Sequence, residues 1–149
     1  MTTCVCSSAS ATLELLTDGL ERGGRAEFRD PTGVHMTLYV ERLQDARAGS
    51  LFIVAHYHRG RELVPDPEVA LLRRSDAWTP LSIALPLSVV VTAGNDGIVI
   101  GGRREEHRRL VKLVDVWMAN VSANLLRHSV PEEQRMLPAI TMALSESPG

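Results

Sequence analysis

Apolar residues recur at helical spacing in two parts of the chain. In the first, which starts near Ser10 and stops at Gly23-Gly24, the stripe consists of Leu13, Leu16 and Leu20. In the second, which starts near Arg104, it consists of Leu110, Val114, Trp117, Val121 and Leu125. Such a stripe is typical of an amphipathic helix with one buried face. The chain is therefore predicted to have a short N-terminal helix and a long C-terminal helix.

Between these helices the pattern changes to that of β-strands. From Val34 to Leu43 apolar and polar residues alternate, and the residues expected to share a buried face are Val34, Met36, Leu38 and Val40. Leu51–Ala55 is apolar throughout, which is typical of a strand buried on both faces. Pro80 indicates that its strand lies at an edge or is bulged. The expected strands are 25–29, 34–43, 51–58, 69–73, 78–83, 88–92 and 98–100.

These elements predict an α+β fold, with a mainly antiparallel sheet of five or six strands and both helices packed on it. A length of 149 residues suits one domain. We expect a flexible tail over residues 1–9, the domain over residues 10–128, and a C-terminal extension over residues 129–149. Pro131 suits the start of a further helix over 132–144. The apolar residues of this segment indicate that it packs on the domain or meets a partner.

Composition narrows the classes of partner. The net charge of −2 argues against a protein that coats nucleic acid, because neutralising phosphates requires clustered cations. Arginines do gather where the long helix begins, but Glu105 and Glu106 dilute their charge, so a solvated surface is the simpler interpretation. Nucleic-acid binding there stays open as an alternative, and it would use Arg103, Arg104, Arg108 and Arg109.

Three further features bear on the expected cellular location. Cys4 and Cys6 are too close in sequence for an unstrained disulfide, and we expect free thiols in a reducing cytoplasm. The chain does not open with a secretory signal pattern. The stretch Ala77–Asn95 carries no charge, yet its prolines and β-branched residues favour strands over a membrane helix. We therefore expect a cytoplasmic protein without a membrane segment.

The candidate chemistry lies in the stretch from Leu51 to Glu68. Side chains alternate on a strand, so His56 and His58 would share one face and Tyr57 the other. Asp66, between two prolines, and Glu68 would approach the histidines if the strands at 51–58 and 69–73 pair as a hairpin. His56 and His58 would then be metal-ligand candidates, and His56, Asp66 and Glu68 the candidate catalytic groups. The alternative is a structural clip in which a buried His56 bonds to Asp66. We expect no bound metal and no cofactor.

Motifs that identify an enzyme class are missing from the sequence. It has no nucleophile elbow, no phosphate-binding glycine loop, no dinucleotide fingerprint and no paired CxxC. A module that binds another molecule is therefore favoured over an enzyme.

Several short motifs resemble those of an uncharacterised family of small bacterial, phage and plasmid proteins, a domain of unknown function. They are Ala55-His56-Tyr57, Gly60, Asp66-Pro67-Glu68, Trp78-Thr79-Pro80-Leu81-Ser82 and the segment 115–120. The chain departs from the family pattern at His58, where the pattern has a second tyrosine, and over 84–104. The resemblance implies a fold and a mobile-element origin but no activity.

Together these observations predict a non-catalytic interaction or accessory protein of phage or mobile-element origin, with a protein partner or self-association. The candidate binding residues are His56, Tyr57, His58, Asp66, Glu68 and Trp78. The alternative function is a metal-dependent hydrolase centred on His56, His58, Asp66 and Glu68.

Overall fold

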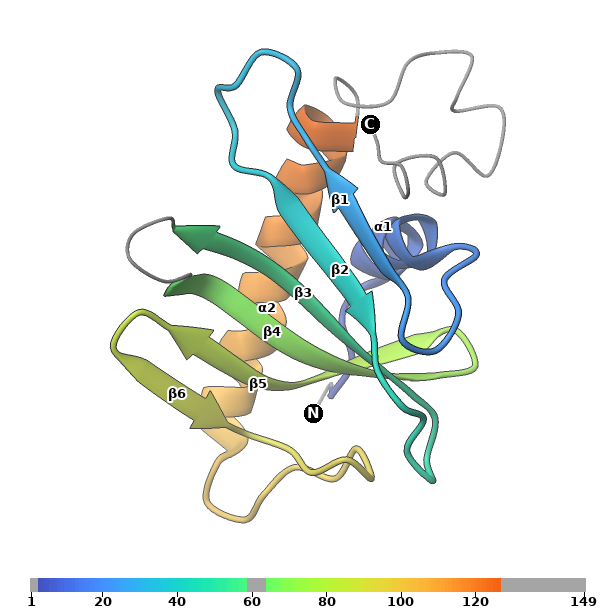
Figure 1. Cartoon of the computed structure of the whole chain (residues 1–149). Helices are drawn as coiled ribbons and strands as arrows, with labels where there is room; N and C mark the ends of the chain where they lie inside the picture. Colours follow the sequence, from blue (N-terminus) through green and yellow to red (C-terminus); the bar gives the residue numbers. More distant parts are fainter. Residues whose placement is uncertain (1–2, 59–63, 127–149) are drawn as a thin grey trace.

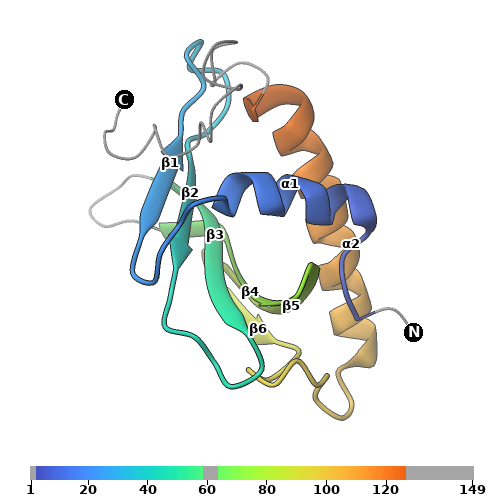
Figure 2. The ribbon, with the colours of Figure 1, turned by 90° about the vertical axis from the view of Figure 1, so that its right-hand side faces the viewer.

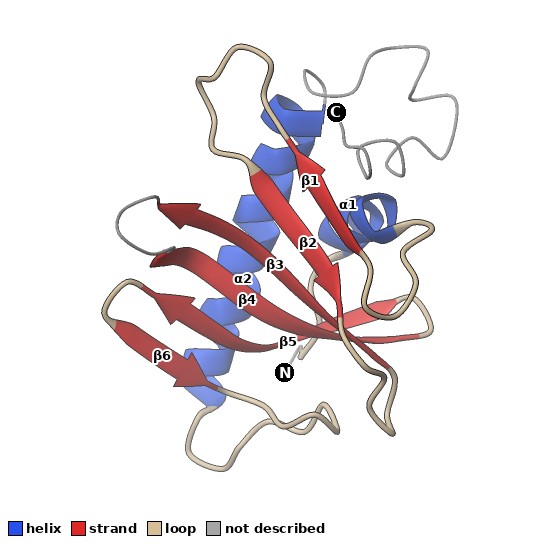
Figure 3. Cartoon of the chain, in the orientation of Figure 1, coloured by secondary structure: helices blue, strands red, loops and turns tan. Residues whose placement is uncertain are grey.

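Six antiparallel strands lie in one sheet in the same order as in the sequence (Figures 1 and 3). The computed structural model describes residues 3–58 and 64–126, so the expected extension over 129–149 and the turn at Gly60 lie outside the described residues. Each strand pairs with the one before it, which is the arrangement of successive hairpins. The strands are β1 (Arg25–Phe28), β2 (Leu38–Arg42), β3 (Ser50–His58), β4 (Val64–Arg74), β5 (Ala77–Leu85) and β6 (Ser88–Val91).

Both helices pack on the same face of this sheet (Figure 2). Helix α1 (Ser7–Thr17) contacts α2 (Arg104–Asn120), and α2 continues into a π-helical segment, η1 (Val121–Leu126). The expected α+β arrangement, with an N-terminal helix and a long C-terminal helix on an antiparallel sheet, is confirmed. We call the face that carries the helices the helix face and the opposite one the outer face.

The N-terminal boundary needs a correction. Residues 1–9 were expected to form a flexible tail, but α1 begins at Ser7 and the side chain of Val5 is buried in the core. The backbone N–H of Val5 donates to the carbonyl oxygen of Trp78 at 3.0 Å. His107, fully buried at the start of α2, donates from Nε2 to the Thr3 carbonyl and accepts at Nδ1 from the Thr92 hydroxyl. These hydrogen bonds attach the segment that precedes α1 to the domain.

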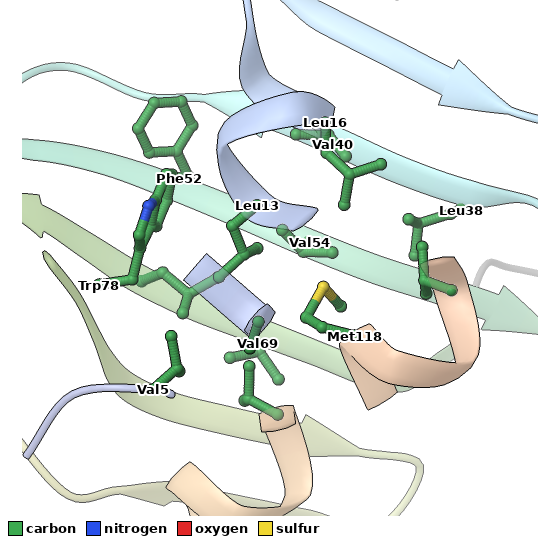
Figure 4. Close-up of a cluster of buried hydrophobic side chains, with 14 of the residues drawn as sticks. Val5, Leu13, Leu16, Leu38, Val40, Phe52, Val54, Val69, Trp78 and Met118 are labelled. Atoms are coloured by element: carbon green, nitrogen blue, oxygen red, sulfur yellow. The ribbon is translucent and has the colours of Figure 1, made fainter. Parts of the chain in front are cut away.

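The core lies between the helices and the sheet (Figure 4). Each strand contributes alternate residues to it, as the pleat of a strand requires. The helices contribute the residues that repeat at helical spacing. Those labelled in the close-up include Leu13, Leu16, Leu38, Val40, Phe52, Val54, Val69, Trp78 and Met118.

Trp78 belongs to this core and is 0% exposed. Its indole N–H donates to the Glu14 carboxylate at 2.8 Å, and Arg73 donates to the same carboxylate at 2.7 and 2.9 Å. Burial alone would raise the pKa of Glu14, but the hydrogen bonds from Arg73 and Trp78 outweigh it and lower that pKa. A buried indole offers no surface to a partner, so Trp78 does not belong among the binding candidates.

Several of the expected strands differ in the structure. β2 begins at Leu38 instead of residue 34, because the Asp30 carboxylate accepts hydrogen bonds from the backbone N–H groups of Thr32 and His35 and organises a turn. Val34 and Met36 are consequently exposed. Residues 98–100 form a single bridge, Ala93 with Val99, instead of a strand. β5 lies between β4 and β6, and Leu81 is its extra residue, so Pro80 marks a bulge and not an edge.

Met118→Ala tests how α2 packs. Met118 is fully buried between α2 and the sheet, so its truncation leaves a cavity and is expected to lower the free energy of unfolding by about 2–5 kcal/mol. The matched control is Val116→Ala on the same helix, where the side chain is 58% exposed and the expected loss is below about 0.5 kcal/mol. Urea denaturation measures both, and equal losses would contradict this packing.

Candidate functional site

The hairpin of β3 and β4 forms as expected and contains a bulge at the candidate residues. Ala55 pairs with Glu68 and Tyr57 pairs with Pro65. Between these pairs, His56 alone on β3 faces two residues on β4, Asp66 and Pro67. The segment 64–67, which preceded the expected strand 69–73, belongs to β4.

The bulge separates the two carboxylates. One extra residue reverses the alternation of a strand, so side chains on either side of it point to opposite faces. Asp66 lies on the helix face, beside Trp117 and Leu113 of α2. Glu68 lies on the outer face and accepts a hydrogen bond from Tyr57. The candidate residues therefore do not form one site.

His56 is held on the helix face by two hydrogen bonds. Its Nε2 accepts from the indole N–H of Trp117 at 3.2 Å, and its Nδ1 lies 2.8 Å from the carbonyl oxygen of Thr37. An indole N–H can only donate and a carbonyl can only accept, so the imidazole is neutral with its proton on Nδ1. Burial lowers the pKa of His56, although the bond to Thr37 and the charge of Asp66 oppose this shift.

The structural clip at His56 exists, but with other partners than Asp66. Nε2 bonds to Trp117 and Nδ1 bonds to Thr37. The expectation that His56 bonds to Asp66 is therefore corrected. Sequence reasoning missed both partners. The Thr37 contact is made by the backbone, which leaves no mark in the sequence. Trp117 did carry a signal, because a tryptophan on a buried stripe needs an acceptor for its N–H.

On the outer face, Tyr57 and Glu68 form a second polar pair. The Tyr57 hydroxyl donates to the Glu68 carboxylate at 3.2 Å. Burial, together with the negative charge of Glu68, raises the pKa of Tyr57 to about 12. Tyr57 therefore stays protonated at physiological pH and serves as a donor.

The expectation that no metal is bound stays a prediction. Among residues 3–58 and 64–126, no three His, Cys, Asp or Glu side chains gather as they would around a metal ion. His58 is the last residue of β3, and its side chain lies outside the described part. A metal at His56 would have to replace its hydrogen bond to Trp117 or to Thr37. The metal-dependent hydrolase is likewise untested.

The arginines at the start of α2 lie on an exposed surface. Arg108 and Arg109 both approach Glu105, at 3.1 and 3.9 Å, as expected if glutamates dilute the charge. Nucleic-acid binding by Arg103, Arg104, Arg108 and Arg109 stays untested. Of the helices in the described part of the chain, none has the length and apolar character that crossing a membrane requires.

A groove on the helix face is lined by apolar residues. It encloses about 640 Å³ between α2 and the ends of β4 and β5. Its apolar walls are Pro67, Leu85, Leu113, Val116 and Trp117, and its polar members are Asp66, Arg109, Lys112 and Asn120. Leu85 is also next to the hairpin that leads into β6. Sequence reasoning missed this groove, since it assigned none of Leu85, Leu113 and Val116 to a site.

No family model, curated protein or solved structure matches this chain. The resemblance to the small bacterial, phage and plasmid proteins therefore stays a prediction.

The neutral state of His56 predicts how stability depends on pH. Its pKa in the folded protein lies below the ordinary value of 6.5, so the unfolded chain binds more protons as the pH falls through 6.5. The contribution of His56 to stability is present above pH 6.5 and is lost as the pH falls toward the folded pKa. Relative to wild type, His56→Gln is expected to lose less stability across this window. Urea denaturation at a series of pH values measures the free energy of unfolding of both proteins. Parallel pH profiles would show that His56 has the same pKa in the folded and unfolded states, which would contradict the prediction.

Proposed function

We propose that the protein is a small, non-catalytic interaction protein that binds an extended segment of another polypeptide along the outer edge of β6. The supporting observation is the difference between the two edges of the sheet. β1 carries charged side chains, Arg25 and Glu27, whereas β6 has the sequence Ser-Val-Val-Val and lies in a stretch without charge. Charges on an edge strand discourage pairing with other chains, and an apolar edge strand favours it.

Side chains around β6 suit such pairing. Val89 and Val91 are exposed, and the neighbouring hairpin presents Leu87, which is 98% exposed. Val90, between the two valines, packs against the core and fixes the orientation of the strand. Backbone hydrogen bonds to an added strand would supply affinity, and its alternate side chains would cover these apolar groups.

The groove beside α2 lies on the helix face, whereas Val89 and Val91, which alternate with the core-packed Val90, lie on the outer face. Leu113 and Val116 are exposed on its wall, and Leu85 links the groove to the β5–β6 hairpin. Exposed apolar groups that lie next to one another tend to mark sites of protein contact. A partner with apolar residues on both sides of its bound strand would cover the edge and reach the groove.

The resemblance to phage and plasmid proteins supports a mobile-element origin and an accessory role toward a host or phage protein. The hydrogen bonds of His56 to Thr37 and Trp117 support a structural role for this residue over a catalytic one. A second copy of the chain would be a suitable partner as well, since β6 can pair with β6 of another copy around a two-fold axis.

Val89→Lys tests the proposal. A lysine on the edge should oppose strand pairing and lower the affinity for apolar peptides, selected on the wild-type protein from a displayed random library, at least about tenfold. Val89 is 68% exposed, so the domain should stay folded. The control is Leu15→Lys on α1, which adds the same charge at a residue that is 51% exposed and should leave affinity unchanged.

Hydrogen exchange and sedimentation complete the test. Bound peptide should slow amide exchange in β6, and any dimer of the wild-type protein should dissociate in Val89→Lys. Peptides that bind Val89→Lys as tightly as wild type, exchange that slows only elsewhere, or a selection that yields no binding peptide with a wild-type protein that stays monomeric would overturn the proposal.

A further inference from the structure

The outer face of the sheet contains a pocket that is separate from both β6 and the groove. It encloses about 350 Å³ over β1, β2 and β3. Its lining alternates with the core residues of the same strands, as the pleat requires, and includes Arg25, Glu27, Tyr39, Glu41, Ile53 and Tyr57. In Figure 1 these strands face the viewer, and neither α1 nor α2 covers them.

Two tyrosines lie side by side in this pocket. The ring centroids of Tyr39 and Tyr57 are 5.5 Å apart, and the rings are tilted by 55°. The hydrogen bond to Glu68 holds the Tyr57 hydroxyl in place. Aromatic rings present a negative face, which attracts cations.

Carboxylates add to the negative potential around these rings. Glu27 pairs with Arg29 at 2.8 Å, and Glu41 pairs more loosely with Arg25 at 4.0 Å. Glu68 accepts its hydrogen bond from a neutral hydroxyl, which does not balance its charge. The charges of Glu68 and Glu41 both contribute to the raised pKa of Tyr57, so they act at the pocket itself.

We propose that this pocket binds a guanidinium group, presented by an arginine side chain. A planar guanidinium can lie against a tyrosine ring and donate two parallel hydrogen bonds to a carboxylate, which a compact ammonium cannot. Arg25 shows that the rim already accommodates this group. Its side chain is 78% exposed, and an exposed pair of this length contributes little, so an incoming arginine can displace it from Glu41.

N-acetylarginine amide is the probe, and N-acetylcitrulline amide, which has the same shape without the charge, is its control. Titration followed by NMR should shift the Tyr39 and Tyr57 signals with the arginine probe, at a dissociation constant on the order of 1 mM, and not with the citrulline probe. Methylguanidinium separates two sources of the ligand. A clearly weaker affinity for methylguanidinium would indicate an arginine within a polypeptide, and an equal affinity would overturn that part of the proposal.

Three variants make the test specific. Glu68→Gln should weaken binding about two- to fivefold, because it removes one negative charge and an exposed ion pair contributes an affinity change of this size. Arg25→Gln should strengthen binding by a similar factor, because it removes the competing cation. Glu105→Gln, which removes a carboxylate on distant α2, should change nothing. Equal binding of the citrulline probe, or weaker binding by Arg25→Gln, would overturn the proposal.

Discussion

Two helices pack on one face of the six-stranded sheet, and this one-sided packing gives the two faces of the sheet different surroundings. Burial of α1 and α2 against the helix face supplies the main core, in which Trp78, Phe52 and Met118 are almost fully enclosed. On the outer face Leu72, Leu81 and Ala93 form a small second core, while the tyrosine pocket lies over β1, β2 and β3. The groove lies beside α2, the apolar edge is the last strand of the sheet, and the tyrosine pocket lies on the face that the helices do not contact.

A one-residue bulge in β4 determines which face of the sheet each candidate carboxylate lies on. It directs Asp66 toward α2 and Glu68 toward the outer face, although the two residues are separated by a single proline. Without the bulge, both carboxylates would share one face. The stretch that resembles a compact catalytic cluster in sequence is therefore divided between the hydrogen bonds of His56 on the helix face and the Tyr57–Glu68 pair on the outer face.

The two surfaces differ in the chemistry that they offer. The β6 edge is apolar and offers backbone hydrogen bonds, so it suits extended chains without regard to charge. The tyrosine pocket is small and negatively charged, so it suits a single cationic group. A polypeptide with an arginine near an apolar strand could use both, but each surface is complete by itself, and each can be tested alone.

Periodicity alone determined the helices, the antiparallel hairpins and much of the core, because apolar stripes such as Leu110 and Val114 must be buried wherever the chain folds. It failed at residues 34–37, where a turn replaces strand pairing because backbone N–H groups of Thr32 and His35 donate to the Asp30 carboxylate. Only the tertiary structure decided what His56, Tyr57, Asp66 and Glu68 do. Their surroundings depend on the register of β3 against β4 and on Thr37 and Trp117, which are 19 and 61 residues away from His56. Contacts over such distances arise when the core packs, and a local pattern of residue types does not encode them.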